Sequence, residues 1–293
     1  MRLLIKRNLT LFFRDRANVF FSMLAVIIVI MLYIIFLADL MVDAIASDIA
    51  YATAAEIRLV VSGLVLSGMI AVATVSSCLN ATARIVIDRE DVAKDFFVSP
   101  ISRSKLMFSY VIASGIIGFI MSGLALVTTI VYLALSGGAF PSFTQVLLLL
   151  LTLFLGVLSA NSMMFLITCF VKSRNAFSSL GSIVGTLIGF LTGVYIPIGQ
   201  LPTGVAWLVR LFPTSHAASM FRQILAGSTL SDLFYGAPSE AVGEIHEFFG
   251  VTFSFGRFTT TFAFSATLLL VSSVVFYIAG LYMMKKQPLQ NGS

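Results

Sequence analysis

Acidic and basic side chains alternate in the stretch at residues 84–105, RIVIDREDVAKDFFVSPISRSK. Apolar side chains follow the charges, and Pro100 stops a helix there because proline cannot continue the backbone hydrogen-bond ladder. A short amphipathic helix with mixed charge and exposed Phe is typical of a surface that docks another protein. The residues predicted to make the docking contacts are Asp88, Glu90, Asp91, Lys94, Phe96, Phe97 and Pro100. The alternative is a solvated loop whose basic residues only flank the neighbouring apolar segments.

Glycine recurs at every fourth position in residues 177–199, FSSLGSIVGTLIGFLTGVYIPIG. The glycines predicted to share one face of a helix are Gly181, Gly185, Gly189 and Gly193. In lipid, helices associate through close van der Waals contact, and small residues at this spacing let two backbones approach. The pattern therefore predicts tight helix packing rather than a substrate site. It leaves open whether the neighbouring helix belongs to the same chain or to another.

The chain lacks the sequence motifs that several kinds of chemistry require. There is no GxxxxGK(S/T) phosphate-binding loop, so the chain does not bind ATP in that way, and there is no HExxH zinc motif. The two histidines, His216 and His246, are expected at the surface rather than as ligands. Cys78 and Cys169 fall inside apolar stretches, where thiols behave as small hydrophobes. We therefore predict no catalytic residue, cofactor, metal site or disulfide in this chain.

The overall composition is that of a membrane protein. Of 293 residues, 59% are hydrophobic and 11% are charged, whereas a soluble domain carries about 25% charged residues. A globular surface made from this chain would be mostly apolar and would aggregate. The net charge of +5 comes in short clusters between apolar runs, which argues against a nucleic-acid partner. The first apolar run is too long for a cleavable signal peptide, and no small-residue cleavage site follows the charged start.

A helix needs roughly 20 apolar residues to cross the hydrocarbon core of a bilayer. Runs long enough to do so lie at about 17–38, 58–80, 106–135, 144–171, 177–198 and 259–283. The fold class predicted is therefore an all-α integral membrane protein with six transmembrane helices in one domain over residues 1–293. The docking stretch at 84–105 joins the second and third spans, and one long connection, at 199–258, joins the fifth and sixth.

The distribution of Lys and Arg predicts the orientation, because cytoplasmic loops carry an excess of both. With the N-terminus in the cytoplasm, the basic residues left on the outer side are Arg58, Arg210, Arg222 and Arg257. An even number of spans returns the C-terminus to the cytoplasm as well. We expect a multi-pass protein of the cell membrane with both ends and the 84–105 stretch inside, and with the connection at 199–258 outside.

The first 15 residues form a basic amphipathic segment. On a helical wheel Arg2, Lys6, Arg7 and Arg14 share one arc, and mostly apolar residues occupy the opposite one. Such a helix lies in the membrane interface with its cations toward anionic headgroups. The alternative is that these cations only flank the first span on its cytoplasmic side.

Prolines interrupt the apolar sequence at residues 195–226, YIPIGQLPTGVAWLVRLFPTSHAASMFRQILA. Pro197 and Pro202 break the fifth span near its outer end, and Pro213 interrupts the apolar run that follows. That run is too short to span, so a re-entrant or interfacial segment is expected between the fifth and sixth spans. Arg210 and Arg222 are expected at the level of the outer headgroups.

The cores of the predicted spans contain no Asp, Glu, Lys, Arg or His. Ion-coupled carriers and proton pumps depend on such groups inside the membrane. If the chain takes part in transport, its energy is therefore expected to come from outside this chain.

In these features the chain resembles the permease subunit of type-2 ABC exporters. The basic start, the six spans and Glu90 followed by FFVSPISRSKL at 96–106 are similar to the family pattern, as are YIPIGQLP at 195–202 and WLVRLFPTSHAASMFRQ at 207–223. One departure is Asp91-Val92-Ala93, where the family commonly has Arg-Gly-Thr. The order of these motifs and their sides of the membrane agree with the family along nearly the whole chain.

The resemblance implies a dimer of permeases, alike or paralogous, with a cytoplasmic ATPase subunit docked beneath each. Residues 88–100 would be the coupling helix, ATP would bind on the partner subunit, and the substrate would be a lipophilic or amphiphilic drug, peptide, lipid or glycan. Two alternatives remain open at this point. One is a membrane scaffold or sensor that signals through the same loop, and the other is a self-contained channel or secondary carrier.

Overall fold

The computed structural model describes residues 1–33, 35, 39, 42, 53–91, 103–234, 238–256 and 258–286. Lys94, Phe96, Phe97 and Pro100, four of the predicted docking residues, lie outside these ranges. The elements in chain order are α1 (Arg2–Arg14), α2 (Arg16–Leu32), α4 (Ala54–Asp91), α6 (Arg103–Leu135), α7 (Phe143–Phe170), α8 (Arg174–Leu191), the 3-10 helix η2 (Ile198–Gln200), α9 (Thr203–Leu211), α10 (Pro213–Leu225), α11 (Gly227–Leu233), α12 (Ser239–Phe248), the antiparallel hairpin β1 (Ser254–Phe255) and β2 (Phe258–Thr259), and α13 (Phe262–Lys286).

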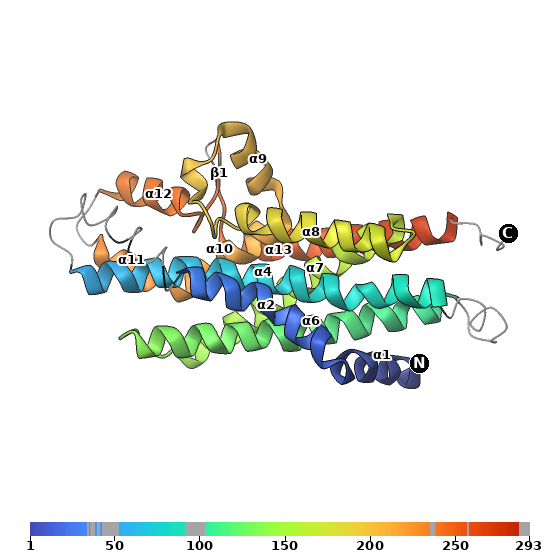
Figure 1. The fold of residues 1–293 in the computed structure, drawn as a ribbon. Helices are drawn as coiled ribbons and strands as arrows, with labels where there is room; N and C mark the ends of the chain where they lie inside the picture. The colour runs from blue at the N-terminus through green and yellow to red at the C-terminus, as the bar shows by residue number, and fades with distance from the viewer. Residues whose placement is uncertain are drawn as a thin grey trace.

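Long helices lie side by side as one bundle (Figure 1). Four of them, α4, α6, α7 and α13, are long and apolar enough to cross a membrane. Helices α2 and α8 run along the same bundle but are not among these four. In its described part α2 has 17 residues, close to the roughly 20 that a span needs. The all-α class is confirmed, and four of the six predicted spans have a helix that meets the length and hydropathy of a span.

Helix α4 lies at the centre of the bundle, with α2, α6, α7, α8 and α10 packed around it. Nearly every residue from Ile57 to Val86 is buried, as expected for a helix that is apolar on all sides. Several of its buried hydroxyls bond to the helix itself: the Ser67 hydroxyl donates to the Gly63 carbonyl, and the Thr74 hydroxyl donates to the Ala71 carbonyl. These hydroxyls of the central helix therefore bond to its own backbone rather than line an open passage.

The fifth predicted span, 177–198, is shorter than the apolar run suggests. Helix α8 ends at Leu191, and Gly193 follows with φ +65°, the left-handed conformation that glycine adopts at helix ends. The chain turns back there, because the Val194 N–H donates to the Gly189 carbonyl. Gly193 is thus a helix-ending residue and not part of a packing face. This corrects the expectation of four glycines on one helix.

The prolines of the 195–226 stretch begin helices. Pro197 precedes η2, Pro202 precedes α9, and Pro213 is the first residue of α10, where a missing N–H costs nothing. Helix α10 is buried along almost its whole length against α4, α7 and α13. Helix α9 keeps Trp207 and Leu208 exposed. The apolar run at 205–212 therefore stays at the surface, and the following helix is the one inserted into the bundle.

The later part of the long connection between the fifth and sixth predicted spans, from residue 227 onward, is partly folded. It contains α11, α12 and the short hairpin, and it buries Val251 and Phe253 against neighbouring segments. In Figure 1 these elements lie away from the end of the bundle where the N-terminus and the end of α13 are found.

Candidate functional site

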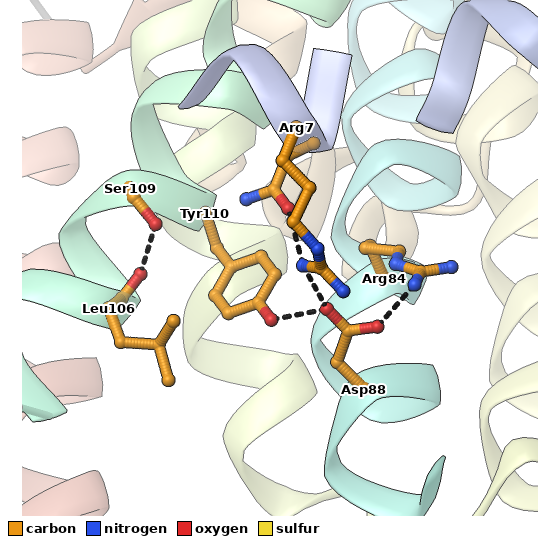
Figure 2. A network of polar contacts seen from close by, with 7 residues as sticks. Arg7, Arg84, Asp88, Leu106, Ser109 and Tyr110 are labelled. Atoms are coloured by element: carbon orange, nitrogen blue, oxygen red, sulfur yellow. Dashed lines mark hydrogen bonds and ion pairs between the residues drawn. The ribbon is translucent and has the colours of Figure 1, made fainter. Parts of the chain in front are cut away.

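A buried carboxylate joins three helices at the end of the bundle nearest the N-terminus (Figure 2). Asp88, in the last turns of α4, is only 2% exposed. Its Oδ2 accepts hydrogen bonds from Arg7 Nη1 of α1 at 2.7 Å and from the Tyr110 hydroxyl of α6 at 2.5 Å. Its Oδ1 lies 2.5 Å from Arg84 Nη2, one turn earlier on α4. One carboxylate is therefore held by two cations and a phenol.

Local sequence explains part of this cluster. Arg84 and Asp88 are four residues apart, so they lie on one face of α4. Phe12 of α1 packs with Ala81 and Ile117, which holds α1 against α4 and α6 and brings Arg7 to Asp88. A buried carboxylate is tolerated only when it is paired and hydrogen-bonded. The cluster therefore fastens α1 to the bundle.

Asp88 was predicted to face a docking partner, and this prediction is wrong. Helix α4 continues to Asp91, so Asp88 falls inside the bundle instead of on a separate docking helix. Its carboxylate oxygens are occupied within the chain. The i, i+4 spacing to Arg84 is the one sequence signal that pointed to an internal pair.

Glu90 and Asp91 form a second ionic link, between the end of α4 and the start of α8. Glu90 Oε2 lies 2.7 Å from Arg174 Nε, and Glu90 Oε1 accepts the Arg174 backbone N–H at 3.0 Å. Asp91 pairs with the same guanidinium. The hydrogen bond that its guanidinium donates to the Asp91 carboxylate raises the pKa of Arg174 above its ordinary value. Both acids remain partly exposed, and they directly precede the remainder of the predicted docking stretch.

Helix α8 presents a polar face that the described parts of the chain do not cover. It packs mainly on α4, through residues such as Ile188, while Ser178, Ser182 and Thr186 stay exposed. A methyl group placed on Gly185 would meet nothing within 4 Å, whereas one on Gly189 would overlap the Tyr195 ring. The glycines of α8 therefore have different neighbours: Gly189 packs within the chain, and Gly185 is open.

Arg222, which was expected at the level of the outer headgroups, is buried inside the bundle. The side chain, on α10, is 1% exposed. Its Nε donates to the Leu64 carbonyl at 3.1 Å, its Nη2 donates to the Thr192 and Gly193 carbonyls at 2.6 and 3.2 Å, and its Nη1 donates to the Gly250 carbonyl at 3.4 Å.

These acceptors explain why a cation is tolerated inside the bundle. Thr192 and Gly193 follow the last turn of α8, where the negative end of the helix dipole favours a cation. Gly193 and Gly250 both have positive φ, which aims their carbonyls at the guanidinium. Arg222 thus ties the inserted helix α10 to α4 and to the end of α8. Its role is to stabilise the fold, because the charge is buried and not on the outer surface.

His216 is likewise internal, contrary to the surface position predicted for it. Its Nε2 lies 2.8 Å from the Arg210 carbonyl, and its Nδ1 lies 3.1 Å from the Ser265 hydroxyl. His246 is half-buried on α12. In the described parts of the chain, no three His, Cys, Asp or Glu side chains gather to hold a metal ion.

Comparison with known proteins identifies the family. The profile of the ABC-2 family transporter proteins matches residues 50–282, which is most of the chain. The chain belongs to the ABC-2 transporter family. None of the curated proteins compared with it matches. The matched region begins just before α4 and runs into α13, so it contains all four candidate spans, Arg222 and the Glu90–Asp91–Arg174 link.

Family membership settles the general role. An ABC-2 protein is a multi-pass membrane permease of an ABC transporter, a transport component that is not itself catalytic, and it works with an ABC ATPase. The matched region excludes α1 and α2. The contact between Arg7 and Asp88 therefore joins a segment outside the family profile to the central helix within it.

Proposed function

We propose that this ABC-2 permease is the membrane half of an ATP-driven exporter, which moves a lipophilic or amphiphilic substrate out of the cytoplasm. Two permease chains, alike or paralogous, form the passage, and ATP binds to two partner ATPase subunits. The observation that carries the proposal is the ionic link of Glu90 and Asp91 with Arg174. It connects the end of the central helix to α8, which presents an exposed hydroxyl face.

The link suggests how force passes through the permease. The ATPase docks on the exposed acids at the end of α4 and on the residues that follow, including Lys94, Phe96, Phe97 and Pro100. When ATP closes the two ATPases, the end of α4 is displaced, and Arg174 carries the start of α8 with it because both carboxylates hold its guanidinium. Tilting of α8 then changes the passage that its hydroxyl face lines.

The proposed orientation has six spans, α2 and α8 included, with both ends of the chain in the cytoplasm. Two observations support it. The N-terminus and the end of α13 lie toward the same end of the bundle (Figure 1). Arg84, Arg89, Lys172 and Arg174 lie at the ends of α4, α7 and α8, as expected for the cytoplasmic side.

Cysteine labelling tests this orientation. In a chain with Cys78→Ala and Cys169→Ala, a membrane-impermeant maleimide applied to intact cells should label Ser239→Cys and leave Lys172→Cys unlabelled. Both positions are exposed, so both should react once the cells are permeabilised. Labelling of Lys172→Cys in intact cells would contradict the orientation.

The polar face of α8 supports the dimer and the passage. The Ser182 and Thr186 hydroxyls donate to the Ser178 and Ser182 carbonyls of their own helix. Their oxygens can still accept hydrogen bonds, which hydrocarbon cannot supply and a protein or aqueous neighbour can. A second permease chain, packed along the Gly185 side, supplies that neighbour and encloses Ser178, Ser182 and Thr186 around the passage. Apolar side chains and hydroxyls without fixed charge suit a lipophilic or amphiphilic substrate better than an ion.

Gly185→Leu tests the dimer contact. A Leu side chain forced into a tight helix interface costs about 1–3 kcal/mol, which weakens association by roughly fivefold to 150-fold. Cross-linking through Ser182→Cys should therefore fall, and transport with it. The same substitution at Gly243, which also has open space around it on α12, is the control and should leave both intact. Undiminished cross-linking in Gly185→Leu would show that this face meets only lipid.

A further inference from the structure

A lateral groove lies between α6, α7 and α13, and α8 is not part of its wall. Its volume is about 580 Å³, within the roughly 300–1,000 Å³ range of small-molecule sites. Phe108, Ile116, Phe154, Val274 and Tyr277 line it. Phe154 is 54% exposed and Val274 is 50% exposed, so the groove opens to the outside of the bundle. An occupant can enter it from the hydrocarbon of the bilayer.

Two of the polar side chains at the groove, Asn161 and Ser273, make hydrogen bonds within the protein. Asn161 Oδ1 accepts a hydrogen bond from the Ser114 hydroxyl at 2.6 Å, and its Nδ2 donates to the Val111 carbonyl at 2.9 Å. The Ser273 hydroxyl donates to the Leu270 carbonyl. What the groove presents to an occupant is therefore mainly hydrocarbon, which suits an acyl chain better than a polar solute.

A basic residue lies at one end of the groove. Lys105 is exposed and lies three residues before Phe108, so it continues the groove-lining stripe of α6 by one turn. A cationic mouth on an apolar groove is complementary to one kind of membrane molecule, an acyl chain that carries a negatively charged headgroup.

We propose that this groove is a binding site for an anionic phospholipid. One acyl chain lies along Ile116, Phe154 and Val274, and the phosphate headgroup lies beside Lys105. The site is separate from the passage proposed at α8, and it does not depend on the ATPase docking. In the proposed orientation its lipid comes from the cytoplasmic leaflet.

Lipid retention tests the proposal. The purified full-length chain is reconstituted in nanodiscs of phosphatidylcholine with a minor share of phosphatidylglycerol, extracted in mild detergent, and analysed by native mass spectrometry. The wild type should retain phosphatidylglycerol in preference to phosphatidylcholine. Ile116→Phe with Val274→Phe fills the groove and should abolish the retention. The matched control, Leu124→Phe with Val275→Phe, changes two equally exposed positions on α6 and α13 outside the groove and should keep it.

A charge substitution tests the headgroup separately. Lys105→Gln should reduce the preference for phosphatidylglycerol by about fivefold, the effect of one basic residue near an anionic headgroup, and Lys172→Gln should not. Equal retention of both lipids by the wild type would overturn the proposal. Undiminished retention in the filled variant would overturn it as well. Both readouts are independent of transport, so the outcome does not depend on the proposed exporter role.

Discussion

Replacing both arginines of the Asp88 cluster should destabilise the permease strongly. Arg7→Gln with Arg84→Gln leaves the Asp88 carboxylate, 2% exposed, with the Tyr110 hydroxyl as its remaining partner from the cluster. Removing the partners of a buried charge costs about 3–5 kcal/mol. In a protein of this size that loss lowers the apparent melting temperature by roughly 10 °C. Thermal unfolding of the detergent-solubilised chain measures it.

The same cluster predicts an order among the variants. Asp88→Asn alone should cost less than the double arginine variant, because Arg7 and Arg84 are about one third exposed and can reach water when their partner is lost. Adding Asp88→Asn to the double variant should recover most of its stability, since no buried charge then remains in the cluster. A triple variant no more stable than the double variant would show that the charge of Asp88 is not the source of the cost.

Reversing the acids at the end of α4 should abolish coupling to the ATPase without unfolding the permease. Glu90→Lys with Asp91→Lys breaks two exposed pairs to Arg174, and exposed pairs contribute only about 0–1 kcal/mol each. The melting temperature should therefore change little, while ATP-dependent transport and recovery of the ATPase with the permease should both be lost. Glu240→Lys with Glu244→Lys makes the same charge change at exposed positions of α12 and should leave transport intact.

A further exchange separates docking from an internal role. Adding Arg174→Glu to the Glu90→Lys and Asp91→Lys chain restores opposite charges between α4 and α8. If the acids serve only to hold α8, this exchange should restore transport. The docking proposal predicts that transport stays lost, because the surface offered to the ATPase is still basic where it was acidic.

Hydropathy predicted the membrane-spanning core because lipid requires long apolar helices whatever their partners are. Helices α4, α6, α7 and α13 follow directly from the apolar runs. The end of α8 could not be predicted from the apolar run. It depends on the left-handed conformation of Gly193 and on the hydrogen bond from the Val194 N–H to the Gly189 carbonyl. In an apolar run, hydropathy cannot distinguish a glycine that packs within a helix from one that ends it.

The buried polar groups were mispredicted because their partners are distant in sequence. Asp88 meets Arg7, which lies 81 residues earlier, and Arg222 meets the Leu64 carbonyl across 158 residues. A charge in the sequence predicts exposure unless such partners are known. Glu90 and Asp91 are exposed in the structure, as a docking surface requires, because the residue that pairs with them, Arg174, is itself at the surface.

ATP-dependent transport in proteoliposomes tests the central claim most directly. The permease is reconstituted with and without the ATPase that co-purifies with it, and export of a lipophilic dye is followed with ATP present or withheld. We predict export only when the ATPase and ATP are both present, and none with the Glu90→Lys, Asp91→Lys chain. Dye movement by the permease alone, or failure of any nucleotide-binding subunit to co-purify, would contradict the account.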